Sequence, residues 1–263
     1  MIIDGKALAL VIKDELKKQV LASGKKLKLA VVMVGDNQSS IRYVAKKKQF
    51  GEDIGVGVDV LQYPLSLNED DLLKKIADLA DNPQVSGLVI QLPLPAHINT
   101  ETILKTVPVD KDVDALNPES KIMSPVARAV ETILEHYQIK VAGKKSVVVG
   151  HGKLVGQPLA SWLKTKKSEV QILDSRTADI KPITATADIL ILGAGSPHFL
   201  KPDMIKEGVV LIDAGTSEAD SKLLGDADPA CAVKCSLFTP VPGGVGPLTV
   251  AMLFKNLLTL ANN

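Results

Sequence analysis

The stretch SVVVGHGKLVGQP, from Ser146 to Pro158, decides the fold of this chain. A short run of β-branched residues ends at Gly150, and two more glycines, Gly152 and Gly156, open a helix-length segment. An apolar run of this length predicts a buried strand, and the glycines permit a tight turn directly after it. The stretch therefore predicts the strand, turn and helix of one unit in a parallel sheet.

The same alternation of short apolar runs and helix-length segments extends in both directions from this unit. Such alternation predicts an α/β protein with parallel sheets covered by helices. A long helical segment at 125–137 separates two series, which indicates a domain boundary near residues 115 to 145. The predicted strands are 29–34, 58–62, 87–92, 146–150, 169–174, 188–195 and 209–215, and the other predicted helices are 39–54, 68–80, 156–164 and the apolar 248–260.

Composition excludes several classes of protein. With 263 residues, 46% of them hydrophobic, the chain can bury a core in one large or two modest domains. A net charge of +1 and 3% aromatic residues supply neither the field nor the stacking platforms of a nucleic-acid binder. We therefore expect no nucleic-acid partner.

The location and the metal content can also be predicted. Cys231 and Cys235 have no matching histidine cluster, so we expect reduced thiols and no metal site. The opening MIIDGKALAL carries Asp4 early and lacks a basic leader with a long apolar segment, and no apolar run reaches the roughly 18 residues of a membrane span. These features predict a cytoplasmic protein that does not bind a membrane.

The glycine turn has the context of a dinucleotide site. Strand, glycine turn, helix, second strand and an acid at its end, Asp174, follow one another in the order of a Rossmann-type unit. Gly150 would permit the turn, Gly152 would let the backbone approach the pyrophosphate, and the helix N-terminus would offer free N–H groups. The third glycine comes one residue late, as GxGxxxG, and a merely structural turn is the alternative.

Asp174 bears on the choice of dinucleotide. A carboxylate at this position can accept hydrogen bonds from the ribose hydroxyls and repels a 2′-phosphate, which favours NAD over NADP. Arg176, two residues later, could instead pair with a phosphate. The residues leave the choice open, with a preference for NAD.

The stretch TPVPGGVGPLT, from Thr239 to Thr249, packs prolines and glycines between a predicted strand and the C-terminal helix. Such a segment is rigid and bare of side chains, so a planar ligand could approach it closely. A structural crossover is the alternative.

Four polar residues of the first series stand out. Tyr43 and Lys47 are four apart on a predicted helix, hence on one face, although a surface pair is the simpler interpretation. Gln91 ends an apolar strand, where its amide needs partners. Asp112 and Asp114 follow a proline-containing turn, where acids usually face solvent.

Taken in order, these segments resemble one family closely, the bifunctional methylenetetrahydrofolate dehydrogenase/methenyltetrahydrofolate cyclohydrolase (FolD) family. The resemblance covers essentially the whole chain and favours a ligand-facing role for 239–249. Its motifs are GDNQSSIRYVAKKK (35–48), GLVIQLPLP (87–95), DKDVDALNP (110–118), VVVGHGKLVGQP (147–158) and TPVPGGVGPLTVAML (239–253).

The resemblance implies an enzyme of one-carbon metabolism that oxidises 5,10-methylenetetrahydrofolate with NAD(P)+ and hydrolyses the methenyl product to 10-formyltetrahydrofolate. It implies a folate-binding catalytic domain at 1–120 plus 246–263, a Rossmann-type domain at 121–245, and a homodimer. By motif match Lys47 is the catalytic lysine, Tyr43 lies against the substrate, Gln91 tunes the lysine, and Asp114 holds the pterin ring.

The resemblance also implies two sets of binding residues. The substrate set is Tyr43, Gln91, Leu92, Pro93, Asp114, Pro242, Gly243, Gly244 and Pro247. The cofactor set is Gly150, His151, Gly152, Val155, Gly156, Asp174, Ser175, Arg176, Gly193 and Gly195, for NADP as the family default or for NAD as Asp174 favours.

The chain departs from the family pattern chiefly on the cofactor side. His151 and Gly152 replace the arginine and serine of the usual GRS, and Asp174-Ser175 replaces a histidine-serine pair. SPVARA (124–129) stands where the family has PCTPxG, DAGTS (213–217) replaces DVGIN, and Ala115 replaces the glycine of KDVDG. These changes leave two alternatives open: a cyclohydrolase with weak or lost dehydrogenase activity, and a non-catalytic dinucleotide- or folate-binding protein.

Overall fold

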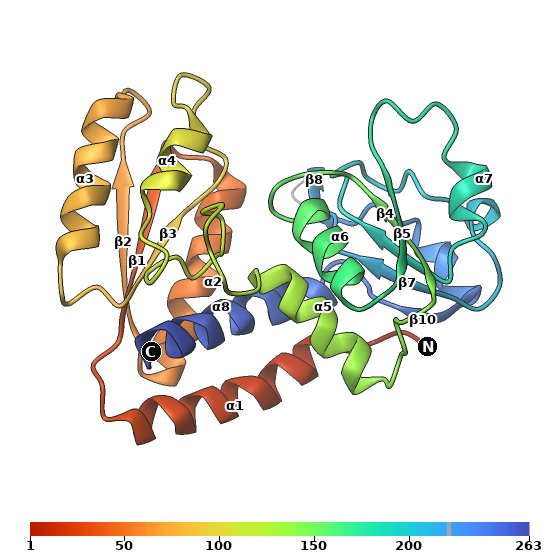
Figure 1. The fold of residues 1–263 in the computed structure, drawn as a ribbon, viewed down its shortest axis with the longest axis horizontal. Helices are drawn as coiled ribbons and strands as arrows, with labels where there is room; N and C mark the ends of the chain where they lie inside the picture. The colour runs from red at the N-terminus through yellow and green to blue at the C-terminus, as the bar shows by residue number, and fades with distance from the viewer. Residues whose placement is uncertain (220–221, 263) are drawn as a thin grey trace. The chain divides into compact units, whose positions relative to one another are not determined.

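A computed structural model of the chain describes residues 1–219 and 222–262 and confirms the α/β fold (Figure 1). The chain divides into two compact units. One unit comprises Leu10–Pro125 and Val250–Asn263, and the other comprises Met1–Ala9 and Val126–Thr249. We call them the Lys47 unit and the glycine-turn unit. The functional division at 1–120 plus 246–263 and 121–245 stays a prediction.

The Lys47 unit holds a three-stranded parallel sheet in the order β2-β1-β3. The central strand β1 is almost wholly buried because it pairs on both edges and is covered on its faces. Its elements are β1 (Lys28–Val34), α2 (Gln38–Ile54), β2 (Gly57–Tyr63), α3 (Glu69–Asp81), β3 (Gly87–Ile90) and α4 (Thr100–Thr106).

Helix α2, which carries two of the predicted catalytic residues, has defined ends. The side chain of Asn37 accepts a hydrogen bond from the Ser40 N–H group at its start, which satisfies an otherwise free donor. Gly55 ends the helix with φ 85°, a conformation that glycine adopts without a steric penalty. The helix therefore begins directly after β1, and its register fixes which residues face inward.

Helix α8 (Val245–Ala261) joins the Lys47 unit, as predicted for the C-terminal helix. The ring of Phe254 stacks on that of Phe50 in α2, with centroids 5.2 Å apart. The amide of Asn256 donates to the carbonyl oxygens of Val113 and Met123, at 2.9 Å each. The helix thereby anchors the segment that precedes and follows Asp114.

The glycine-turn unit holds a five-stranded parallel sheet in the order β10-β7-β6-β4-β5. After β4 the chain runs to one side, into β5, and then returns to the other side through β6. The switch point of this sheet therefore lies between β4 and β6, where open α/β sheets bind ligands at the carboxyl ends of their strands. Its elements are α5 (Pro125–His136), β4 (Lys145–Val149), α6 (Gly156–Thr165), β5 (Glu169–Leu173), α7 (Lys181–Thr184), β6 (Ile189–Leu192), β7 (Val209–Asp213) and β10 (Cys235–Phe238).

Three kinds of element lie outside the sequence prediction. Helix α1 (Gly5–Ser23) leaves Leu10, Val11 and Leu21 exposed, so its apolar residues form no single stripe and its helical period is weak. The pair β8 (Ser217–Ala219) and β9 (Lys222–Leu224) and the helices α4 and α7 are too short to carry a period. Two 3₁₀ turns, Pro202–Met204 and Pro229–Val233, complete the described elements.

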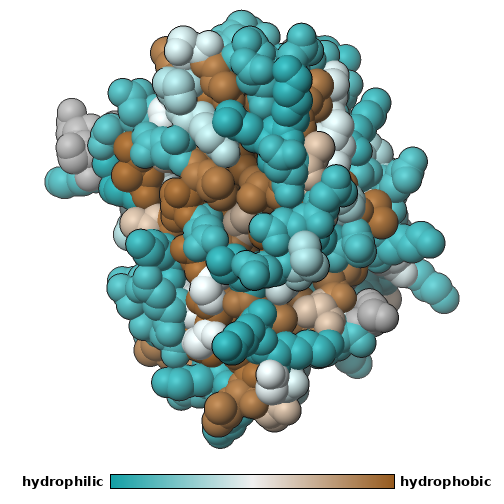
Figure 2. All heavy atoms as spheres, turned by 90° about the vertical axis from the view of Figure 1, so that its left-hand side faces the viewer, coloured by the Kyte–Doolittle hydropathy of each residue, from teal (hydrophilic) through white to brown (hydrophobic). Residues whose placement is uncertain are grey.

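The surface is mixed in polarity. On the face shown in Figure 2, hydrophilic residues cover most of the surface and hydrophobic residues show in patches between them. Across residues 1–219 and 222–262, each helix is too short or too polar to pass through a bilayer.

Candidate functional site

Lys47 is a buried cation on α2. Its exposed fraction is 3%, whereas the neighbouring Lys46 and Lys48 are exposed. The helical period turns only the middle lysine of the three inward, together with Tyr43 one turn earlier. The simpler interpretation of Tyr43 and Lys47 as a surface pair is therefore wrong for Lys47.

Two polar groups and an aromatic ring surround the Lys47 ammonium. Its Nζ donates to Oε1 of Gln91 at 3.2 Å and lies 3.9 Å from Oδ2 of Asp114. It also lies 5.0 Å from the centre of the Tyr43 ring. Gln91 donates through its own amide to the Leu92 carbonyl oxygen at 2.8 Å, which turns its acceptor oxygen toward the lysine. The structure thus brings together all four predicted catalytic residues, Tyr43, Lys47, Gln91 and Asp114, which we call the Lys47 cluster.

Burial shifts the proton affinity of this cluster. It lowers the pKa of Lys47, and the nearby Asp114 carboxylate offsets only part of that shift. Burial also raises the pKa of Asp114 and that of the Tyr43 phenol, so Tyr43 stays protonated at neutral pH. The cluster therefore holds an amine poised to lose its proton beside a carboxyl poised to gain one.

The loop that carries Asp114 is fixed by a second acid. Asp112 is buried, not solvent-facing, and its Oδ2 accepts the Asn117 N–H group at 2.8 Å. Burial raises the pKa of Asp112 to about 6. Ala115 has φ 55°, in the left-handed region that disfavours residues with a Cβ. The turn keeps a glycine-like conformation although alanine occupies it.

The remaining predicted substrate residues fall into two groups. Leu92 is half-buried and its carbonyl oxygen also accepts from the Ser40 hydroxyl at 3.4 Å, while Pro93 is exposed. Both lie in the Lys47 unit with Gln91.

The second group belongs to the glycine-turn unit and precedes or opens α8: Pro242, Gly243, Gly244 and Pro247. Gly243 has φ 105°, and a Cβ on Gly244 would stand 2.6 Å from the Pro240 carbonyl oxygen, so this backbone requires both glycines.

The three glycines after β4 have different environments. Gly150 has φ 99°, and a Cβ on Gly156 would lie 1.9 Å from the Gly150 carbonyl oxygen. Packing within the turn therefore requires both residues to be glycine. A Cβ on Gly152 would meet nothing within 4 Å, so the protein itself gives no reason for glycine there. Open space beside a bare backbone leaves room for a ligand.

Helix α6 begins beside this open space. Its N-cap residue, Val155, makes no side-chain hydrogen bond to the first turn. The positive end of the helix dipole is thus uncapped by a side chain, which favours an anion. A Cβ on Gly193, after β6, would lie 2.4 Å from Cγ1 of Val155, so the loops after β4 and β6 pack directly against each other.

Asp174, at the end of β5, is paired within the protein. Its Oδ2 accepts from Nε of Arg176 at 3.1 Å, and its Oδ1 accepts the Arg176 N–H group at 3.0 Å. These bonds lower the pKa of Asp174, with a smaller effect from the charge of His151. Ser175 and His151 are exposed. The structure brings Asp174, Arg176 and His151 into one charged group at the carboxyl end of the sheet.

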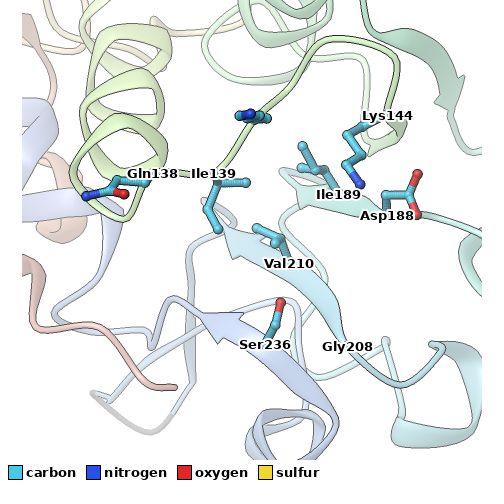
Figure 3. Close-up of a pocket in the computed structure, with 9 residues that line it drawn as sticks. Gln138, Ile139, Lys144, Asp188, Ile189, Gly208, Val210 and Ser236 are labelled. Atoms are coloured by element: carbon cyan, nitrogen blue, oxygen red, sulfur yellow. The ribbon is translucent and has the colours of Figure 1, made fainter.

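A cavity of about 250 Å³ opens at the opposite end of the same sheet (Figure 3). Ile189 and Val210, at the amino ends of β6 and β7, line it together with Ser236. It contains none of the predicted site residues. In parallel sheets ligand chemistry gathers at the carboxyl ends of the strands, and the glycine turn marks that end here.

Within the part of the chain that the structure describes, His, Cys, Asp and Glu form no cluster of three or more that could hold a metal ion. Cys231 and Cys235 are buried free thiols, and burial raises their pKa values to about 11 and about 12.

Comparison with known proteins gives two matching family models. Residues 3–114 match the catalytic domain of tetrahydrofolate dehydrogenase/cyclohydrolase, and residues 124–263 match its NAD(P)-binding domain. The chain belongs to the tetrahydrofolate dehydrogenase/cyclohydrolase family. The predicted family is confirmed, and its dinucleotide-binding domain is the one that contains the glycine turn.

Individual relatives agree with this assignment. The bifunctional protein FolD of Lactobacillus delbrueckii subsp. bulgaricus is 39% identical over 272 residues, which span 98% of this chain and 96% of that protein. The crystal structure of the bifunctional enzyme FolD from Campylobacter jejuni superposes with a TM-score of 0.95 at 36% identity, over 100% and 99% of the two chains. A Trypanosoma brucei FolD complexed with NADP and an inhibitor gives 0.95 at 32% identity, over 100% and 97%.

Sequence reasoning missed three acids that shape the two sites of this family member. Asp112 supports the Asp114 loop, and Asp213 and Asp226 are buried beneath the loops that follow β6 and β7. The sequence carries no signal for the burial of these acids, because an acid beside a turn usually faces water and its amide partners are set by tertiary packing.

Proposed function

We propose that this chain oxidises 5,10-methylenetetrahydrofolate to the methenyl form and hydrolyses that product to 10-formyltetrahydrofolate. The observation that carries the proposal is the buried Lys47, held by Gln91 and faced by Asp114. A lysine that served only as surface charge would not be withdrawn from water at the cost of its ammonium form.

Lys47 is assigned the proton transfer. In the hydrolysis, water adds to the cationic methenyl carbon and must lose a proton as the new C–O bond forms. The bond from that carbon to N5 then breaks as the formyl C=O forms, and the hydroxyl proton passes to N5. Burial lowers the pKa of Lys47 and so favours its neutral amine relative to that of an exposed lysine, and this amine can accept the proton that the water loses. Gln91 keeps the amine in one place because its acceptor oxygen is itself oriented by the Leu92 carbonyl group. This arrangement supports hydrolysis without a metal-bound water.

Asp114 and Tyr43 are proposed to bind and orient the substrate. A carboxylate can accept two hydrogen bonds from an aminopyrimidine edge, which orients a pterin ring for attack. Asp114 sits on a loop that Asp112 and Asn256 fix on either side, so its position is defined before any ligand binds. The half-buried Tyr43 ring offers a flat apolar surface next to the amine. Leu92, Pro93, Pro242, Gly243, Gly244 and Pro247 complete the proposed substrate set.

The dinucleotide is assigned to the turn after β4. When bound, it supplies the hydride acceptor of the oxidation. The uncapped start of α6 and the open space at Gly152 fit a pyrophosphate, with Gly150, Val155, Gly156, Gly193 and Gly195 shaping the surrounding backbone. The adenosine ribose is proposed to lie against His151, Asp174, Ser175 and Arg176.

We infer that NAD is preferred over NADP. The Asp174 carboxylate can accept from both ribose hydroxyls, and Arg176 is already engaged by that carboxylate. A 2′-phosphate would have to break this pair and remain beside the carboxylate. The exposed His151 is a weak substitute for the fixed arginine of the usual motif.

The test is a paired assay on the purified protein. Methylenetetrahydrofolate is supplied with NAD or NADP, and methenyl absorbance is followed; separately, methenyltetrahydrofolate hydrolysis is measured without dinucleotide. We expect both activities, with a higher kcat/KM for NAD. Hydrolysis without oxidation by either dinucleotide would establish the monofunctional alternative, and neither activity would support the non-catalytic one.

The homodimer, the cytoplasmic location and the absence of nucleic-acid and membrane partners stay predictions. Sedimentation equilibrium of the purified chain tests the first of them, with a mass of twice 27.9 kDa expected.

A further inference from the structure

We propose that Asp226 is a positioning residue for dinucleotide binding, which acts by holding the loop after β6 from beneath. The inference rests on the proposed function, because it takes that loop to be part of the dinucleotide site. Asp226 itself would touch neither cofactor nor substrate.

The Asp226 carboxylate binds three consecutive backbone N–H groups. Its Oδ2 accepts from Ala194 at 2.7 Å and from Gly195 at 3.1 Å, and its Oδ1 accepts from Ser196 at 2.7 Å. Gly195 has φ 68°, so the three N–H groups converge on one point. Successive N–H groups arranged in this way form a nest that binds anions. In this protein the anion is an internal carboxylate.

The loop is exposed although the carboxylate is not. Ala194, Gly195 and Ser196 are exposed, whereas Asp226 is fully buried, with an exposed fraction of 0%. The N–H groups of this loop therefore point into the protein, and its other side is left to face a ligand. The N–H group of Gly193 is also engaged within the protein, because it donates to the Val149 carbonyl oxygen at 2.8 Å. The predicted residues Gly193 and Gly195 can contribute shape to the site but not these donors.

The surrounding backbone leaves space for the carboxylate. A Cβ on Gly215 would lie 2.1 Å from Cγ of Asp226, and a Cβ on Gly225 would lie 2.3 Å from Oδ2 of Asp213. Two glycines are thus needed to admit two buried acids at the carboxyl end of the sheet. A substitution of either glycine would displace a carboxylate from its amide partners.

Asp213 ties the neighbouring loop in the same way. Its Oδ1 accepts from Gly215 at 3.0 Å and its Oδ2 from Ala227 at 2.8 Å. Its own N–H group donates to Oγ1 of Thr239 at 2.6 Å, at the start of the proline-glycine stretch. Asp226 is therefore one part of a buried support that spans the loops after β6, β7 and β10.

The competing explanation is that Asp226 only stabilises the fold. The two roles differ in what the loss of Asp226 would do. Loss of Asp226 would free the loop at 194–196 while the strands beneath keep their ladder hydrogen bonds. Dinucleotide affinity should then fall, while methenyl hydrolysis, whose four proposed catalytic residues all belong to the Lys47 unit, continues.

The first experiment uses the unmodified protein and amide hydrogen exchange by NMR without ligand. The amides of Ala194, Gly195 and Ser196 should exchange at least 100-fold more slowly than unstructured amides, despite lying in an exposed loop. Exchange at the rate of an unstructured chain would show that Asp226 does not hold them and would overturn the proposal. This measurement remains decisive even if a variant fails to fold.

The second experiment compares Asp226→Asn with Asp188→Asn. An asparagine has one acceptor oxygen, so at least one of the three N–H groups would face its NH₂ group. Asp188 is the matched control, because its carboxylate also accepts a backbone N–H group, from Lys145 at 2.9 Å, but at the amino end of β6. Calorimetric titration with NAD and with NADP gives Kd, and methenyl hydrolysis reports on the Lys47 unit.

We expect Asp226→Asn to raise the dinucleotide Kd at least tenfold and to speed exchange at 194–196, with hydrolysis within twofold of the unmodified protein. Asp188→Asn should leave Kd within twofold. Equal Kd values for the unmodified protein and Asp226→Asn would overturn the role of Asp226 alone. Failure of the unmodified protein to bind either dinucleotide would instead overturn the proposed function of the loop, and the two failures are thereby distinguished.

Discussion

The two proposed ligand sites, the Lys47 cluster and the glycine turn, differ in which part of the chain forms them. At Lys47 the functional groups are side chains: an amide, a carboxylate and an aromatic ring lie around one buried amine. At the glycine turn the site is formed by the backbone, and the defining residues are Gly150 and Gly156, which have no side chain at all. A site made of side chains fails when one identity changes, whereas a site made of backbone tolerates changes at any position that keeps its path.

This difference explains where the chain departs from its family. The four residues of the Lys47 cluster keep the family pattern, while His151 and Asp174 replace other residues around the turn. Both of these lie on the rim of the site, where a side chain can change without altering the backbone path. We therefore expect these replacements to affect which dinucleotide binds, while the backbone path of the glycine turn is kept.

Replacing Lys47 with methionine should have the largest effect. Lys47→Met keeps the length and the apolar stem but removes the only buried amine of the cluster, so methenyl hydrolysis should fall at least about 100-fold, as for loss of a general acid-base group. The decay of methenyl absorbance measures the rate. The matched control is Lys48→Met, one residue along the same helix and exposed, which should retain full activity. Unchanged hydrolysis in Lys47→Met would show that side-chain chemistry does not define this region.

The buried acids beneath the loops of the glycine-turn unit should make the free energy of unfolding depend on pH. Burial and the neighbouring Asp226 raise the pKa of Asp213 to about 7. The folded protein therefore binds this proton more tightly than the unfolded chain, whose aspartates titrate near pH 4. Stability gained from the protonated form is present at low pH and is lost as the pH rises toward 7, with a slope of at most about 1.4 kcal/mol per pH unit.

The measurement is urea unfolding between pH 5 and pH 8 for the unmodified protein and Asp213→Asn. Asparagine carries no titratable proton, so the unmodified protein should lose stability relative to the variant as the pH rises. The groups facing Asp213 are Asp226 and Cys231, and neither is changed in the variant. A stability difference that is constant across this range would contradict the prediction.

A smaller effect is expected at the rim of the dinucleotide site. Asp174→Ser removes the carboxylate and frees Arg176 to meet a 2′-phosphate, so the ratio of kcat/KM for NADP to that for NAD should rise about tenfold, equivalent to about 1.4 kcal/mol. Asp179→Ser is the control, since this acid lies five residues further along the chain and accepts the Lys181 N–H group. If the ratio is the same in both variants, the rim does not select the cofactor.

The sequence predicts most of the sheet structure because strands such as 146–150 and 29–34 are continuous apolar runs between turn residues. It also predicts Lys47 and Asp114 as site residues, through the family resemblance. It cannot predict that Asp112 and Asp226 are buried, because an acid after a turn usually faces water and its amide partners are set by tertiary packing. Nor could it show that Arg176 neutralises Asp174, since that depends on the loop conformation.

The smallest expected effect is on stability, at Ala115, the residue that follows Asp114. Its φ of 55° is a conformation in which a Cβ costs about 1 to 2 kcal/mol, part of which is offset because glycine loses more backbone freedom on folding. Ala115→Gly should therefore stabilise the protein by about 0.5 to 1 kcal/mol, measured by urea unfolding. Ala77→Gly, at an exposed position inside α3, is the control and should destabilise by a similar amount, because helix interiors disfavour glycine. The same substitution would then have opposite signs at two sites of one unit. A destabilised Ala115→Gly would mean that the Asp114 loop gains nothing from a glycine at this position.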